Sequence, residues 1–214
     1  MSYLFSPKGR GNLRIWKNPE PDNYYSIGAD TAEGLVNGDF TCAEVFDKKN
    51  YEQVAEWHGK CPPDLFAFEL KKLGEFYNNA KVVVESNNHG LVTLTYLKPI
   101  YYNLYYRREF DKRDNKATRQ MGFRTTGKSK PILIDDFNKL FRENELIING
   151  RELLTEMSTY EEDENGGMNA MHNCNDDRVI AACLSIHGLK EIVIIENIPI
   201  RYGKYRSSNP ITGY

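Results

Sequence analysis

Acidic residues stand beside apolar segments at three points of the 214-residue chain, where carboxylates could do chemistry. Asp30 ends the β-rich run NYYSIGAD, Glu85 follows the apolar run KVVV, and Asp176 and Asp177 precede the apolar run RVIAACLSI. Each has a purely structural explanation, as a turn residue, a strand end or a helix cap. Because every one of them adjoins an expected core element rather than an open face, we treat them together as one candidate site.

Clustered carboxylates repel one another and need a counter-charge, for which Mg²⁺ or Mn²⁺ with oxygen ligands is the natural choice. Two such ions, about 3.5–4 Å apart, activate a water molecule and stabilise the leaving oxygen in phosphodiester hydrolysis. Sites in α/β sheets gather at the carboxyl ends of strands, so Asp30 and Glu85 should emerge at the same edge. The sequence therefore predicts a two-metal site, provided that the two strands are neighbours.

A second candidate is the stretch GFRTTGKS at 122–129, which fits the phosphate-loop pattern G-x-x-x-x-G-K-[ST]. A phosphate loop must leave a buried strand and open a helix, but the preceding FDKRDNKATRQM is charged and Pro131 follows two residues later. We interpret the stretch as a strand and loop entering a helix, with Thr125, Thr126 and Ser129 at the helix start. Lys128 then serves as a phosphate contact or as a positive charge near an active site.

The segment 107–130 is basic, with nine Lys or Arg against three acidic residues in a chain of net charge −2. The simplest explanation is a solvated loop, and the alternative is a surface that holds a polyanion such as DNA. The candidate DNA contacts are Arg107, Arg108, Lys112, Arg113, Arg119, Arg124, Lys128 and Lys130.

The apolar pattern predicts an α/β layered domain with a mixed sheet, in which an antiparallel meander precedes parallel strands reached through helical crossovers. Strands are expected at 23–30, 40–47, 51–59, 81–86 and 100–106, and helices at 61–79, 87–99, 131–144 and 176–188. The segment 151–171 fits a helix running into a strand or loop. We expect an irregular lead-in over 1–23, one domain over 24–190 with a basic insertion at 107–130, and a loose tail over 191–214.

The composition is that of a globular protein, with 40% hydrophobic residues and a mean hydropathy of −0.61. No apolar run is long enough to span a membrane, and the first residues lack the features of a signal peptide. The cysteines lie far apart, which favours free thiols in a reducing compartment over disulfides. His172 and Cys174 lack a second pair at ligand spacing, so zinc is not expected. The four cysteines are Cys42, Cys61, Cys174 and Cys183.

As a set, the stretches SIGADTAEGLVNGDF, VVVESNNHG, GFRTTGKSKPILIDDF and HNCNDDRVIAACL resemble the nuclease domain of the large terminase subunit of tailed bacteriophages. The resemblance covers about residues 24–188 and implies a ribonuclease H-like, or retroviral-integrase-like, fold. It implies a divalent-metal-dependent endonuclease that cuts concatemeric viral DNA during packaging in the host cytoplasm. The implied partners are double-stranded DNA, the terminase ATPase domain, the small terminase subunit and the portal protein, with no membrane.

The same resemblance implies roles for individual residues. Asp39, after the glycine-rich turn, resembles an additional acid near the first catalytic aspartate, and GFRTTGKSK resembles the run entering the helix after the fifth strand. His172 and Asn175 stand near the last carboxylates, and we assign neither a role. The implied catalytic metal ligands are Asp30 and Glu85, with Asp176 or Asp177 supplying the last carboxylate.

Three alternatives to this nuclease stay open. The fold could serve a junction resolvase or a nuclease of RNA–DNA hybrids, and the chain could be a binding module that docks on packaging proteins with little activity alone. The third alternative is a nucleotide site at GFRTTGKS. No acceptable Walker motif or room for a motor precedes Tyr24, so we expect an isolated nuclease domain that neither hydrolyses ATP nor translocates DNA.

Overall fold

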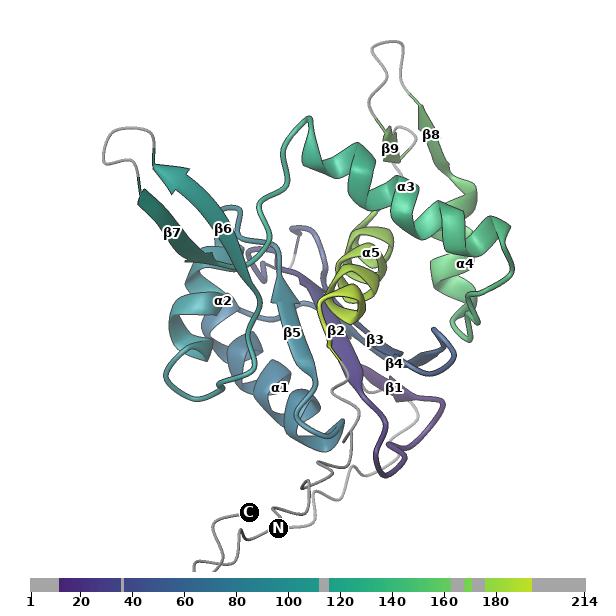
Figure 1. Cartoon of the computed structure of the whole chain (residues 1–214), viewed down its shortest axis with the longest axis horizontal. Coiled ribbons are helices and arrows are strands. Elements are labelled where there is room, and N and C mark those ends of the chain that lie inside the picture. Colours follow the sequence, from purple (N-terminus) through teal and green to yellow (C-terminus); the bar gives the residue numbers. More distant parts are fainter. Residues whose placement is uncertain (1–11, 36, 112–115, 163–167, 171–175, 194–214) are drawn as a thin grey trace, which may run out of the picture.

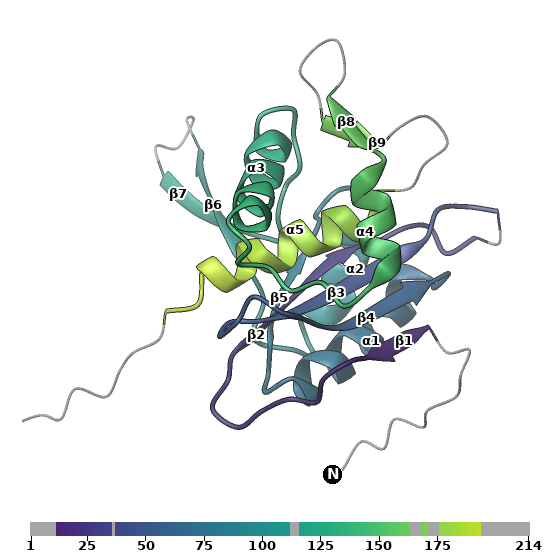
Figure 2. The ribbon, with the colours of Figure 1, turned by 90° about the vertical axis from the view of Figure 1, so that its right-hand side faces the viewer.

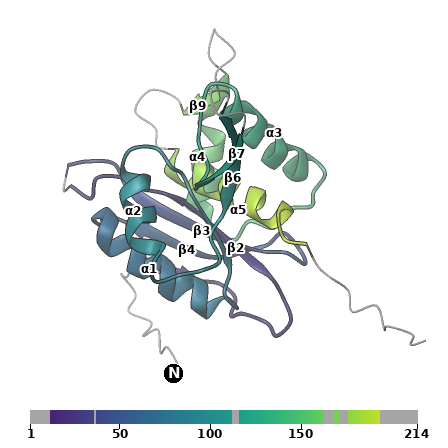
Figure 3. The same ribbon diagram turned by 60° about the vertical axis from the view of Figure 1, so that its left-hand side comes forward.

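The computed structural model of the chain describes residues 12–35, 37–111, 116–162, 168–170 and 176–193. These residues form three layers around a five-stranded sheet (Figure 1). Two helices, α1 and α2, cover one face of the sheet, and α5 lies across the other face with α3 and α4 beside it (Figures 2 and 3). The mixed α/β architecture expected from the sequence is confirmed.

The sheet has the strand order β1-β4-β3-β2-β5, in which β2 and β5 are parallel and the other neighbours are antiparallel. The predicted meander and the parallel strand beside it are therefore present. The strands are β1 (Leu13–Ile15), β2 (Tyr25–Asp30), β3 (Thr41–Asp47), β4 (Gln53–Gly59) and β5 (Lys81–Val84).

Five helices and two small antiparallel hairpins complete the described chain, and the hairpins project from the same end of the molecule (Figure 1). The helices are α1 (Pro63–Phe76), α2 (His89–Leu97), α3 (Ser129–Arg142), α4 (Arg151–Ser158) and α5 (Asp177–Lys190). The hairpins pair β6 (Tyr106–Asp111) with β7 (Lys116–Met121) and β8 (Tyr160–Glu162) with β9 (Met168–Ala170).

Two predicted segments differ from the structure. The lead-in over 1–23 is not wholly irregular, because β1 pairs along β4 with Leu13 opposite Trp57. The strand expected at 100–106 is wrong, since this segment touches the sheet through one bridge between Val82 and Leu104 and then enters β6. Its many tyrosines favour a strand, but Tyr101 is buried as a packing residue next to Gly74 of α1 instead.

The apolar face predicted for α1 is also partly wrong. Leu65 and Phe68 are 53% and 47% exposed, while Phe66 and Leu70 are fully buried. The buried stripe is thus displaced by about one residue around the helix, an ambiguity that arises because α1 is apolar over more than one face.

Strand alternation divides the side chains of the sheet between two cores. On the α1–α2 side, Ile27, Ala29, Val82 and Val84 join the first core. On the other side, Val83 joins the second core with the helices α3, α4 and α5. Polar residues of β2, β3 and β4 share this second side, among them Ser26, Glu44 and Glu56, all buried.

Helix α5 lies unusually close to β2 because two glycines stand at the contact. A Cβ atom on Gly28 would meet the backbone oxygen of Ala181 at 1.9 Å, and one on Gly188 would meet Ser26 Oγ at 2.1 Å. Ser185 Oγ donates a hydrogen bond to Ser26 O at 2.8 Å between them. The helix was expected to end at Gly188 but continues to Lys190, since this glycine serves close packing rather than helix termination.

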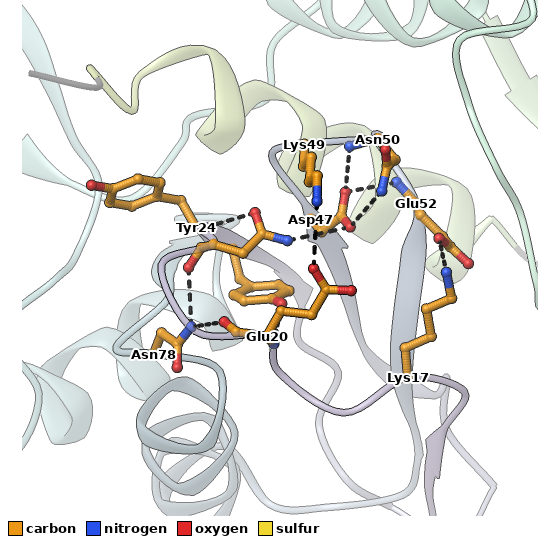
Figure 4. Close-up of polar contacts among 10 residues, drawn as sticks. Lys17, Glu20, Tyr24, Asp47, Lys49, Asn50, Glu52 and Asn78 are labelled. Atoms are coloured by element: carbon orange, nitrogen blue, oxygen red, sulfur yellow. Dashed lines mark hydrogen bonds and ion pairs between the residues drawn. The ribbon is translucent and has the colours of Figure 1, made fainter. Parts of the chain in front are cut away.

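At the far end of β2, away from Asp30, Asp47 organises the turn between β3 and β4 (Figure 4). Asp47 Oδ1 accepts hydrogen bonds from the backbone N–H groups of Asn50 at 2.8 Å and Glu52 at 3.3 Å. Lys17 forms an ion pair with Glu52, which ties the segment after β1 to this turn. This polar cluster fixes the register of the meander from which β2 carries Asp30 to the opposite edge.

The contact at Gly28 gives a test of the fold. We expect Gly28→Ala to lower the free energy of unfolding by about 1–3 kcal/mol, because the added methyl group must displace backbone atoms of α5. Chemical denaturation measures the change. Gly127→Ala is the matched control, since a Cβ there meets nothing within 4 Å. A Gly28→Ala protein as stable as wild type would contradict the close packing of α5 on β2.

Candidate active site

Strand pairing brings Asp30 and Glu85 together. In the parallel pair of β2 and β5, Ala29 is opposite Val84, and the N–H of Glu85 donates to Ala29 O at 2.9 Å. The next residues along both strands are Asp30 and Glu85, and alternation turns both side chains towards α5. The two carboxyl groups lie close enough to share a hydrogen bond when one of them is protonated, and each is partly buried.

The first turn of α5 adds Asp176 and Asp177 to the same region. The helix starts at Asp177 and packs along β2, with Ala181 against Gly28 and Gly188 against Ser26. The charges of both aspartates raise the pKa of Asp30, with Asp177 contributing more than Asp176. The sequence-predicted carboxylates Asp30, Glu85, Asp176 and Asp177 therefore lie in one cluster.

Burial and mutual repulsion raise the pKa values in this cluster. Burial raises the pKa of Asp30 well above its usual value, and the charge of Glu85 and their shared hydrogen bond raise it further. Burial also raises the pKa of Asp177 to about 7, helped by the nearby charges of Glu156, Asp176 and Asp39. Carboxyl groups held in this way would gain from a nearby cation.

Asp39 lies close enough for its charge to act on Asp177, so the additional acid predicted after the glycine-rich turn is near the cluster. It is exposed, whereas Asp177 is partly buried. Asp176 is also engaged from another direction, by an ion pair of 3.2 Å with Lys130 Nζ at the start of α3. His172, Cys174 and Asn175 lie outside the described residues.

The donor set fits a divalent cation by its chemistry, because the crowded groups are carboxyl oxygens with raised proton affinity. No three Asp, Glu, His or Cys side chains within the described ranges form a group with metal-binding geometry. Asp30 and Glu85 are in contact, and the third carboxylate on α5 stands beside them rather than closing a cage.

The basic segment is divided between the hairpin β6–β7 and the start of α3. Arg107 is held in the structure, since its Nη1 donates to Ser86 Oγ at 3.0 Å, Met121 O at 2.7 Å and Gly122 O at 3.0 Å. Arg108 and Arg119 are exposed and directly opposite each other in the hairpin register. Arg124 and Lys128 are exposed in the loop before α3. Lys112 and Arg113 lie outside the described residues.

The stretch GFRTTGKS has the structure of a helix start instead of a phosphate loop. Thr126 Oγ1 accepts a hydrogen bond from the N–H of Ser129 at 3.1 Å, and Ser129 Oγ accepts one from the N–H of Thr126 at 2.9 Å. This reciprocal pair resembles a capping box, with Ser129 in place of the usual Glu or Gln, and it lies in the turn that leads into α3. At the other end of the stretch, Phe123 forms a bridge with Glu85. The loop that would wrap phosphates is therefore used to connect the β5 edge to α3.

Sequence reasoning missed three charged residues that surround the start of α5. Arg178 forms ion pairs of 2.6 Å with both Glu56 of β4 and Glu156 of α4. The available signal was a charged residue in the otherwise apolar run after Asp177, and glutamates at inward positions of β3 and β4. Alternation alone could have placed Glu56 on the α5 side, but its partner could not be identified without the fold.

Comparison with solved structures identifies the fold. The chain is similar to the large terminase nuclease of thermophilic phage G20c with bound magnesium, with a TM-score of 0.65, 21% identity and coverage of 83% of this chain and 88% of that chain. For the nuclease domain of the Thermus phage P74-26 large terminase, the TM-score is 0.63 and the identity 22%, with 83% of this chain and 86% of that chain covered. For the P22 large terminase nuclease domain, the TM-score is 0.53 and the identity 19%, with 83% of this chain and 88% of that chain covered.

The expected ribonuclease H-like fold, as found in terminase nuclease domains, is thus confirmed. The G20c nuclease has also been solved with bound cobalt and with bound zinc. No protein-family model and no curated protein matches the chain. None of the helices in the described part of the chain is long and apolar enough to cross a membrane.

The raised pKa of Asp177 predicts how stability depends on pH. A carboxyl whose pKa is higher in the folded than in the unfolded protein binds its proton more tightly when folded, so stability falls as pH rises from about 4 towards 7. In metal-free buffer we expect the free energy of unfolding to be lower at pH 8 than at pH 5. Asp177→Asn should shrink this difference by about 1–2 kcal/mol, less than the full shift because the group is partly exposed.

Denaturation at the two pH values, with chelator present, measures this effect. Asp30 and Glu44 also have raised pKa values, so the pH dependence should shrink in Asp177→Asn without disappearing. Asp135→Asn, at an exposed position of α3, is the control and should leave the difference unchanged. If Asp177→Asn shows the same difference in free energy of unfolding between pH 5 and pH 8 as wild type, the pKa of Asp177 is not raised in the folded protein.

The capping box gives a separate test of GFRTTGKS. Thr126→Ala should lower stability by about 1 kcal/mol, since the N–H of Ser129 loses its acceptor. Lys128→Ala removes an exposed side chain and should leave stability unchanged. Isothermal titration with Mg-ATP should give no saturable binding. Saturable ATP binding that is lost in Lys128→Ala would restore the phosphate-loop interpretation.

Proposed function

We propose that the chain is a nuclease domain of the terminase large-subunit kind, which cuts double-stranded concatemeric viral DNA during genome packaging by divalent-metal-dependent hydrolysis. The observation that carries this proposal is the contact between the carboxyls of Asp30 and Glu85 beneath the first turn of α5. The fold supports it, because the chain is similar to solved structures of terminase nucleases, including one with bound magnesium.

Asp30, Glu85 and Asp177 would hold Mg²⁺ or Mn²⁺, with Asp176 as a further candidate ligand. The larger effect of Asp177 on the pKa of Asp30 supports this order. When bound, a pair of such ions supplies an activated water and stabilises the leaving oxygen of the phosphodiester. The protein holds Asp30 and Glu85 in a partly buried position, where few water molecules compete for their oxygens.

Basic side chains around the carboxylates would hold the DNA backbone. Lys130, paired with Asp176, brings a positive charge to the edge of the cluster. Arg108 and Arg119 repel each other across the hairpin, and a bound phosphate would relieve that repulsion. Contacts of this kind read the phosphates and not the bases, so cutting should have little sequence preference. Arg124 and Lys128 belong to the same proposed surface, as do Arg107, Lys112 and Arg113 by their charge.

In this proposal, the domain spans residues 24–190 with the basic insertion at 107–130, and Asp39 assists the cluster from the loop after β2. It acts in the host cytoplasm with the terminase ATPase domain, the small terminase subunit and the portal protein. The capped start of α3 argues against nucleotide binding at GFRTTGKS, which leaves ATP hydrolysis to such a partner.

Plasmid cleavage tests the proposal. The wild-type protein should cut supercoiled plasmid with Mn²⁺ or Mg²⁺ and lose this activity with chelator. Asp30→Asn and Glu85→Gln should each reduce the rate at least about 100-fold, because each removes a carboxylate that no neighbouring group replaces in charge. Gel electrophoresis over a time course gives the rates.

Asp135→Asn, an exposed substitution of the same chemistry, should cut like wild type. Cleavage unchanged in Asp30→Asn would contradict the assignment of the site. A strong preference for four-way junctions or RNA–DNA hybrids over plain duplex would favour the related nuclease functions. DNA binding with no metal-dependent cutting would instead favour a binding module that needs its packaging partners.

A further inference from the structure

Arg178 follows directly after the two aspartates in the first turn of α5, and its side chain is only 11% exposed. Its Nε donates to Glu56 Oε2 and its Nη1 to Glu156 Oε1, each at 2.6 Å. The guanidinium therefore joins three separate elements, which are α5, strand β4 and helix α4. A planar fork with two fixed donors defines both the position and the rotation of the helix turn that carries it.

Glu156 makes a second contact with the same turn, through the backbone. Its Oε2 accepts a hydrogen bond from the N–H of Arg178 at 2.9 Å. The first N–H groups of a helix have no partner within the helix, and here α4 supplies one. Asp176 stands at the N-cap position but makes no capping hydrogen bond with its side chain. The capping that an aspartate usually provides is done by Glu156.

Helix α4 is itself fixed to the sheet at its start. Gln53 Oε1 accepts hydrogen bonds from the N–H groups of Asn149 at 3.0 Å and Gly150 at 2.6 Å, while its Nε2 donates to Glu44 at 2.7 Å. Gln53 and Glu44 are fully buried in β4 and β3. A continuous polar path thus leads from the sheet through α4 to the first turn of α5.

From these contacts we infer that Arg178, together with Glu156, is a positioning residue that holds the first turn of α5 so that Asp177 stays beside Asp30 and Glu85, from where it can join them in binding a divalent cation. This inference rests on the proposed function. It assigns the pair no contact with DNA or with the reacting atoms. Their role is to fix the position of the Asp177 carboxylate before the cation binds. Less conformational entropy is then lost when the cation binds.

A purely structural role makes a different prediction. Arg178 also offsets the buried charges of Glu56 and Glu156, so removing its charge would destabilise the protein whatever happens at the cluster. Arg178→Lys keeps the charge and loses the fork, which separates positioning from charge compensation. Glu156→Gln keeps the size of the side chain and one oxygen acceptor, but it replaces the other oxygen with an amide NH2 and loses the negative charge that fixes the guanidinium.

The experiment measures Mn²⁺ binding by isothermal titration without DNA, and the Mn²⁺ concentration that gives half-maximal plasmid cleavage. Arg178→Lys should bind Mn²⁺ about 10–100-fold more weakly and need a correspondingly higher concentration for cleavage. At saturating Mn²⁺ its rate should return towards wild type, whereas Asp177→Asn should stay impaired. DNA affinity measured in chelator should not change in Arg178→Lys.

Glu156→Gln should shift the Mn²⁺ requirement in the same direction, and its effect should not add to that of Arg178→Lys because both break one interaction. Arg151→Lys, an exposed arginine at the start of α4, is the matched control and should titrate like wild type. Circular dichroism establishes which variants are folded. If Arg178→Lys fails to fold, the folded Glu156→Gln variant decides the outcome by the same titration.

Two results overturn the inference in distinguishable ways. A wild-type protein that cuts DNA, with a folded Arg178→Lys or Glu156→Gln variant that has the wild-type Mn²⁺ requirement, overturns the positioning role alone. A wild-type protein that neither binds Mn²⁺ nor cuts DNA overturns the proposed function, and the role of Arg178 with it.

Discussion

The close approach of α5 to β2 is the constraint on which the rest of the structure depends. The backbone of the helix lies against Gly28, where any side chain would collide with Ala181 O, and the strand ends two residues later at Asp30. Because the helix runs opposite to the strand, its first turn comes to the carboxyl end of β2. A single packing contact therefore determines that carboxylates nearly 150 residues apart in sequence share one location.

This arrangement concentrates negative charge, and the surrounding structure limits the cost in different ways. Burial and repulsion raise the proton affinity of Asp30 and Asp177, so part of the charge can be neutralised by protons at moderate pH. Lys130 balances Asp176 from α3, and Arg178 balances Glu56 and Glu156 one layer deeper. The carboxylates around Asp30 keep an excess of negative charge, which suits them to binding a cation. The charges of Arg178, Glu56 and Glu156 are paired with one another, which suits them to a structural role.

The sequence was sufficient for those parts of the fold that depend on local pattern. The apolar run before Glu85 and the alternation before Asp30 predicted two strands that end at the same edge of the sheet, and the pattern after Asp177 predicted a buried helix. It was insufficient where a residue's role depends on a distant partner. Gly188 resembles a helix end unless Ser26 is known to lie against it, and Arg178 resembles a surface charge unless Glu56 and Glu156 are known to face it. The tyrosines over 100–106 favour a strand by propensity, yet tertiary packing takes Tyr101 to α1.

The helix start at Thr126 has a consequence for how such sequences are classified. The letters of a phosphate-loop motif arise here from unrelated requirements: Gly122 has a positive φ of 74° where the chain leaves the hairpin, and Thr126 and Ser129 satisfy each other's N–H groups. A pattern search would assign this chain a phosphate loop, although the stretch has the local structure of a helix entry. The same amino acids are favoured by turns, helix entries and phosphate cradles, so coincidental convergence on the motif is to be expected wherever a basic loop enters a helix.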